Sequence, residues 1–111
     1  MSLDKVAQID AAGIDRNSGS VVLTIADYWD WANERQHLLA LQAKLNAYFR
    51  FIESGQILKS YPEAHGRTVT IDIVGKHALP LSAEQFLLKA TEAAKQLNVT
   101  ISSRHIPGGH E

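Results

Sequence analysis

Residues 38–52 read LLALQAKLNAYFRFI, and this stretch decides the fold. Its apolar residues recur every three or four positions: Leu38, Leu41, Leu45, Tyr48 and Ile52. Residues at these spacings lie on one face of an α-helix. We therefore predict a long helix from Trp31 to Ser54 that packs one face on a core, with Gly55 in the left-handed conformation that ends it.

A second helix is predicted to start at Ser82. Ser82 and Gln85 have the spacing of a capping box, and Leu81 and Phe86 occupy the two positions of a hydrophobic staple. The apolar face of this helix is expected to consist of Phe86, Ala90, Ala93 and Leu97.

Shorter runs with β character flank the two helices. Residues 6–14 and 20–26 are joined by the turn formers 15–19 and predict a hairpin. Apolar and polar residues alternate in residues 68–74, and residues 99–106 form the last predicted strand. Residues 56–61 are a weaker candidate strand that stops at Pro62.

The element order ββα(β)βαβ indicates the fold class. We predict an α+β two-layer sandwich, in which a mixed sheet of four to five strands carries both helices on one face. The alternative is a ferredoxin-like fold with an extra N-terminal strand, although a tight hairpin would compete for the central position of that sheet.

Length and composition predict one domain over residues 1–111, with 107–111 as a loose tail. The chain has 111 residues, of which 45% are hydrophobic, so it can bury its own core. It contains no cysteine, no apolar leader and no apolar run near the 20 residues that a membrane span needs. We expect a soluble cytoplasmic protein with no membrane association.

The charge pattern argues against nucleic-acid binding. The net charge is −1, and the basic residues are scattered singly rather than clustered in a stripe. Nucleic acid is therefore not an expected partner.

Several segments together resemble one protein family. They are Ile25-Ala26-Asp27 followed by Trp31, residues 37–48, residues 51–55, Tyr61-Pro62 and the strand 68–74. In these the chain is similar to a family of small bacterial proteins of unknown function. The resemblance implies a bacterial cytosolic protein but brings no activity and no catalytic residue with it. Some short proteins of this kind serve as immunity proteins or other partner-binding accessory proteins, which suggests such a role here by analogy.

No motif for catalysis, metal or cofactor binding is present in the sequence. The five histidines (His37, His65, His77, His105 and His110) lack metal-ligand spacing, and we expect each at the surface or in a loop. Glu34 and His37 have i, i+3 spacing, but a metal site in a helical bundle needs a second such pair. No serine has a nucleophile-elbow setting, and no glycine-rich loop would hold phosphate. We predict no cofactor and no metal.

These absences favour a non-catalytic protein-binding or regulatory module, which could also associate with itself as a homodimer. The candidate binding residues are an aromatic residue after the second strand and polar residues on the open face of the sheet: Trp29, Thr70, Asp72, Ser102 and Arg104. The alternative is an enzyme or small-ligand protein. A deep pocket with converging groups such as His77, His105 or Asp72 would favour that alternative.

Overall fold

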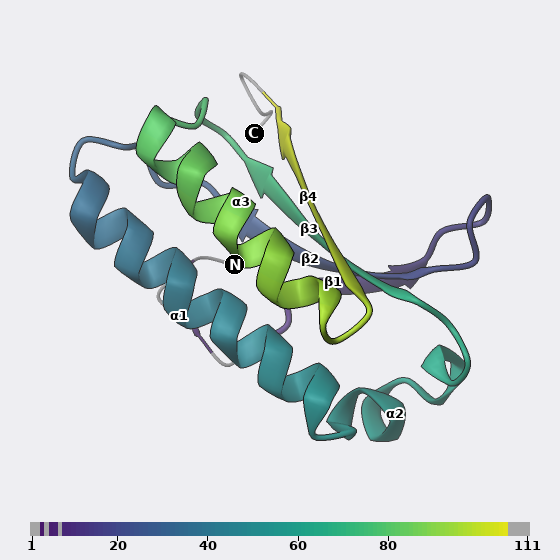
Figure 1. Cartoon of the computed structure of the whole chain (residues 1–111). Helices are drawn as coiled ribbons and strands as arrows, with labels where there is room; N and C mark the ends of the chain where they lie inside the picture. The colour runs from purple at the N-terminus through teal and green to yellow at the C-terminus, as the bar shows by residue number, and fades with distance from the viewer. Residues whose placement is uncertain (1–2, 4, 7, 107–111) are drawn as a thin grey trace.

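A computed structural model describes residues 3, 5, 6 and 8–106 and shows one sheet with helices packed on it (Figure 1). The predicted tail 107–111 lies outside the described residues. In chain order the elements are β1 (Ala11–Ile14), β2 (Val21–Asp27), α1 (Glu34–Glu53), α2 (Gln56–Ser60), the 3-10 helix η1 (Pro62–Ala64), β3 (Val69–Gly75), α3 (Leu81–Lys95) and β4 (Val99–His105).

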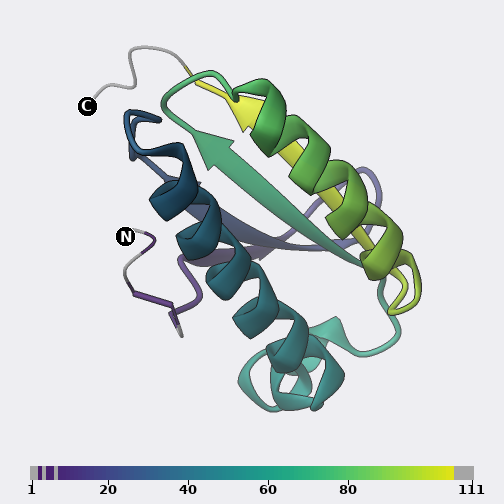
Figure 2. The same cartoon turned by 60° about the vertical axis from the view of Figure 1, so that its left-hand side comes forward.

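The sheet is mixed, with the strand order β1-β2-β3-β4. β1 is antiparallel to β2, whereas β2, β3 and β4 are parallel to one another. Parallel neighbours need a crossover connection, and α1 and α3 supply the two crossovers. Both helices lie on the same face of the sheet in two views (Figures 1 and 2). The predicted α+β class with two long helices on one face is confirmed.

The weak candidate strand at residues 56–61 is wrong, because this segment forms α2. Gly55 has φ +85°, which turns the chain sharply after α1, and Ile57 then anchors the new helix by burying its side chain. β3 is thus the only strand between α1 and α3. A ferredoxin-like order requires two strands there, so that alternative is not what the structure adopts.

The N-terminal hairpin is present but its first strand is short. β1 covers Ala11–Ile14 rather than starting at residue 6. Asp15 forms the turn by accepting the backbone N–H of Asn17 at 2.8 Å, and Gly19 takes φ +74° before β2 begins. Turns select Asp for such side-chain bonds to the backbone and Gly for a positive φ.

The core lies between the sheet and the two long helices. Alternate residues of the central strands are fully buried: Leu23, Ile25, Ile71 and Ile73. α1 adds Leu41, Leu45 and Tyr48 from the predicted stripe, whereas Leu38 and Ile52 are only half-buried. α3 contributes Ala83, Leu87 and Ala94, and the predicted Ala93 is exposed because the helix is rotated by about one residue from the predicted face.

The capping box predicted at Ser82 is also wrong. Pro80 is the N-cap of α3, and its carbonyl oxygen accepts the N–H groups of Ala83 and Glu84. Proline suits the start of a helix because its fixed φ is already helical and it has no N–H to satisfy. Ser82 therefore lies inside the first turn, where its hydroxyl donates to Glu34 Oε1 of α1 at 2.7 Å.

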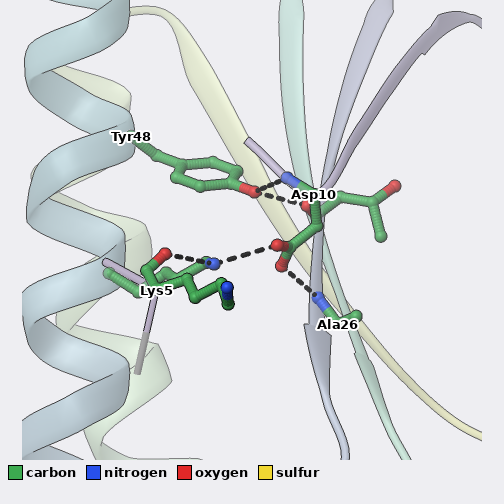
Figure 3. Close-up of polar contacts among 6 residues, drawn as sticks. Lys5, Asp10, Ala26 and Tyr48 are labelled. Carbon is green, nitrogen blue, oxygen red and sulfur yellow. Dashed lines mark hydrogen bonds and ion pairs between the residues drawn. The ribbon is translucent and has the colours of Figure 1, made fainter. Parts of the chain in front are cut away.

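A buried polar cluster fastens the N-terminal segment to α1 (Figure 3). The Lys44 side chain is 0% exposed, and its Nζ donates to the Asp10 carboxylate at 3.0 Å and to the Lys5 carbonyl oxygen at 2.9 Å. The Tyr48 hydroxyl donates to the carbonyl oxygen of Thr24 and accepts the N–H of Asp10 at 2.9 Å. Burial raises the pKa of Tyr48, so this hydroxyl stays protonated and can donate.

Asp10 also ends the pairing between β1 and β2. Its Oδ2 accepts the backbone N–H of Ala26 at 2.9 Å, on the side of β2 from which β1 has already departed. A side-chain carboxylate thus supplies the acceptor that the backbone of a longer strand would have supplied. Beyond β1, this edge of β2 is closed by the N-terminal segment.

Candidate functional site

Four of the five predicted binding residues lie together on the face of the sheet opposite the helices. Thr70 and Asp72 on β3 are in register with Thr100 and Ser102 on β4. The Asp72 carboxylate accepts Ser102 Oγ at 3.0 Å and Arg104 Nε at 2.9 Å, and Arg104 Nη2 lies 2.8 Å from the same carboxylate. This places a fixed polar group in the middle of the open sheet face.

A shallow hollow of about 630 Å³ runs over this face. Small and short side chains form its floor: Ala11, Gly13, Val22, Thr24, Thr70 and Asp72. α1 and α3 lie on the other face of the sheet (Figure 2), so neither of these described helices covers the hollow. Its lining holds one base, Arg104, and two acids, Asp15 and Asp72. Asp72 and Arg104 neutralise each other, which leaves Asp15, at the turn between β1 and β2, as the remaining charged side chain of this polar face.

Trp29 is not on that face. It lies in the loop between β2 and α1, is half-buried, and packs against the core. Its ring meets the ring of His37 edge to face with centroids 5.6 Å apart, and Trp31 stacks on His37 with centroids 3.5 Å apart. The structure therefore separates Trp29 from the other four predicted residues.

His37 corrects the expectation that every histidine is a surface or loop residue, because its side chain is 1% exposed. His37 Nε2 lies 2.6 Å from Asp27 Oδ2, and Nδ1 lies 2.9 Å from the carbonyl oxygen of Asp30. A carbonyl oxygen only accepts, so His37 Nδ1 carries a hydrogen. The second proton of the Asp27–His37 pair lies between Nε2 and the Asp27 carboxylate oxygen. Glu34 faces Ser82 instead, so Glu34 and His37 do not form one site.

Asp27 and His37 use most of their hydrogen-bonding capacity in contacts within the chain. Burial raises the pKa of the Asp27 carboxyl, while its hydrogen bond to His37 opposes that rise. Asp27 Oδ1 also accepts the N–H of Trp29 at 3.2 Å, and both ring nitrogens of His37 are occupied. We conclude that this pair fastens the β2–α1 loop to the first turns of α1.

A pocket of about 280 Å³ opens beside Asp27 at the carboxyl ends of the parallel strands. Its lining includes the polar side chains Asp27, His77, Glu84, Arg104 and His105, together with apolar groups such as Ile73 and Leu79. Open α/β sheets bind small ligands at this end of their strands. The volume lies just below the usual range for ligand pockets, which begins near 300 Å³.

No metal centre is formed by the described residues, since no three His, Cys, Asp or Glu side chains gather in a suitable group. No helix in the described part of the chain is long and apolar enough to cross a bilayer.

The outer side of β4 is the second notable surface. Within residues 3, 5, 6 and 8–106, no strand pairs with this side of β4. A groove of about 320 Å³ runs along it between α3 and β4, lined by Leu79, Leu87, Leu88, Thr91 and Ile101, with Glu84 and two serines at its margins. Leu88 is 69% exposed, so a large apolar side chain stands at the rim of an open strand edge.

Sequence reasoning missed the buried ionisable groups: Asp10, Asp27, His37 and Lys44. A signal for two of them exists, because His37 and Lys44 fall at helical spacing with Leu41 and Tyr48. Polar residues at such positions are usually read as interruptions of an apolar face, whereas here each has a buried carboxylate as its partner.

One comparison with known proteins gave a match. The model of a family described as Family of unknown function (DUF6572) matches residues 1–107. The chain belongs to this family. No curated protein and no solved structure matched the chain. The resemblance seen in the sequence is therefore confirmed at the level of a family of unknown function.

Proposed function

We propose that the chain is a non-catalytic protein-binding module that docks a partner along the outer side of β4 and the adjoining sheet face. The observation that carries this proposal is the unpaired edge of β4 beside an apolar groove. Unpaired N–H and C=O groups at a sheet edge form hydrogen bonds readily with an added strand, and exposed apolar side chains beside them add specificity.

The composition of the sheet face also supports protein binding. Interfaces are depleted of uncompensated charge, and on this face the Asp72 carboxylate is already paired with Arg104. An immunity-like role, in which the chain caps another protein, is one form of this function.

Two variants of one residue test the proposal. Ser103→Pro removes a single N–H at the β4 edge and blocks strand addition there, whereas Ser103→Ala keeps that N–H. We expect a partner protein, either another chain or a second copy, to bind wild type and the Ala variant but not the Pro variant in matched captures from cell extract. The proposal fails if no bound protein distinguishes the two variants.

The pocket beside Asp27 supports a second candidate function, the binding of a small polar ligand. The specific observation is that Asp27, His77 and His105 line one pocket at the carboxyl ends of the parallel strands. Both histidines are exposed and can donate or accept hydrogen bonds.

Ligand screening by NMR tests the second candidate. A library of small polar fragments should shift the ring resonances of His77 and His105 together, and His77→Ala should abolish the shift at His105. His65→Ala, which changes an exposed histidine outside the lining, should leave it unchanged. If no fragment shifts both rings, this candidate is abandoned.

A further inference from the structure

Backbone geometry determines which groups of β4 are available to a partner. Ile106 N–H donates to the Gly75 carbonyl oxygen at 2.9 Å, and backbone groups alternate sides along a strand. The even-numbered residues of β4 therefore turn their N–H and C=O groups toward β3. Those that turn them outward are Val99, Ile101, Ser103 and His105.

This outward set is self-complementary. We propose that the partner at this edge is a second copy of the chain, added antiparallel about a two-fold axis at Ser102; this inference rests on the proposed function. In that register Val99 lies opposite the second copy's His105, and Ile101 lies opposite the second copy's Ser103. All four outward residues are then paired, whereas a shift of two residues in either direction leaves one of them unpaired.

The side chains fit the same register. On the open face, Arg104 lies opposite the second copy's Thr100 and not opposite another arginine, so no like charges meet directly. Ser102 lies opposite its own copy, where two short hydroxyl side chains fit the close spacing of a pair without backbone hydrogen bonds.

The helix side of the edge supplies the apolar contact. Leu88 shares the groove with Ile101, Ser102 and Ser103, so it lies level with the two-fold axis. Two-fold pairing brings the α3 helices of both copies side by side over one continuous sheet, and each Leu88, 69% exposed in the single chain, lies against the other copy. Pairing of β4 with the β1 edge of the next copy would leave a new open β4 edge each time and build a fibre, whereas the antiparallel β4–β4 pair is closed.

Analytical ultracentrifugation tests the inference. We expect the wild-type chain to sediment at twice its 12.2 kDa mass in the high micromolar range and to dissociate on dilution. Ser103→Pro should sediment as a monomer, Ser103→Ala should remain a dimer, and Leu88→Lys should raise the dissociation constant about tenfold or more. Far-UV circular dichroism of each variant shows whether it is folded, and Leu39→Lys is the control for a charge placed on an exposed leucine of α1.

The outcomes separate the inference from the proposed function. A wild-type chain that stays monomeric at every concentration, or a dimer that survives in folded Ser103→Pro, overturns pairing of two copies through β4. If the wild type is monomeric but a different protein distinguishes Ser103→Pro from Ser103→Ala, the proposed function stands and only the second copy as partner is wrong.

Discussion

The two edges of the sheet differ: the β1 edge is short and largely covered, whereas the β4 edge is longer and open among the described residues. At the β1 edge the strand is four residues long, and only Ala12 and Ile14 turn their backbone groups outward, since Ala11 and Gly13 pair with β2. Beyond β1, Asp10, Lys44 and Tyr48 fix the N-terminal segment against β2 and α1.

At the β4 edge, twice as many residues turn their backbone N–H and C=O groups outward. Natural proteins usually protect sheet edges, and the open β4 edge beside the exposed Leu88 is the feature on which the proposed docking surface rests.

The largest expected effect concerns the closed edge. Lys44→Met removes the cation that lies beside the buried Asp10 carboxylate, and breaking a buried ion pair costs about 3 to 5 kcal/mol. Urea denaturation measures the change. The control is Lys95→Met, which breaks an exposed pair with Glu92 and should cost less than about 1 kcal/mol. Equal losses in the two variants would mean that the closed edge does not depend on its polar cluster.

Tyr48→Phe sharpens the same comparison with a smaller change. The ring and its packing are kept, but the Thr24 carbonyl oxygen and the Asp10 N–H lose their common partner. Each unsatisfied buried group costs about 1 to 3 kcal/mol. Because Tyr48 and Lys44 both contact Asp10, the losses in the double variant should be non-additive, which a double-mutant cycle measures. Additive losses would show that the two contacts act independently.

Asp27, at the carboxyl end of β2, predicts a pH dependence. Burial raises the pKa of its carboxyl above the ordinary value of 3.8, so between 3.8 and the raised pKa the folded chain binds more protons than the unfolded chain. Its contribution to stability is therefore fully present below pH 3.8 and is lost as the pH rises through the raised pKa.

Asp27→Asn removes this titration. Urea denaturation at several pH values gives the free energy of unfolding of the wild type and of the variant. The wild-type value minus the variant value should decrease as the pH rises from 3.8. A difference that grows with pH would show that the His37 contact outweighs burial.

The smallest effect is expected on the side of the open edge, at the start of α3. Ser82→Ala removes an exposed hydrogen bond to Glu34 and no cap, so it should cost less than about 1 kcal/mol. Thermal unfolding of Ser82→Ala and Glu34→Ala should give similar small losses. A loss near 2 kcal/mol in Ser82→Ala alone would reinstate Ser82 as a helix cap.

The strongly periodic parts of the fold could be predicted from the sequence, and the polar interior could not. The spacing of Leu41, Leu45 and Tyr48 predicts α1 because helical burial imposes that period. α2 is five residues long, too short for its period to distinguish a helix from a strand. The partners of Lys44 and His37 lie in segments distant along the chain, and no local pattern relates them.

For the candidate surface, the alternation of β3 and β4 placed Thr70, Asp72, Ser102 and Arg104 on one face of the predicted sheet, and the structure has them there. Trp29 could not be placed, because its position depends on how the loop after β2 folds over His37. The free β4 edge depends on strand order, which local sequence patterns do not determine.

The Lys44 contacts also constrain the order in which the chain can fold during synthesis. Lys5 and Asp10 leave the ribosome first, yet their oxygens bind a side chain that lies 39 and 34 residues later. The N-terminal segment can dock only after α1 has emerged, since domains fold as units once their contacts exist. Until α1 has emerged, the edge of β2 beyond β1 is not covered by the N-terminal segment. A nascent chain stalled before Lys44 would therefore expose this edge to the nascent chains on neighbouring ribosomes of the same messenger RNA.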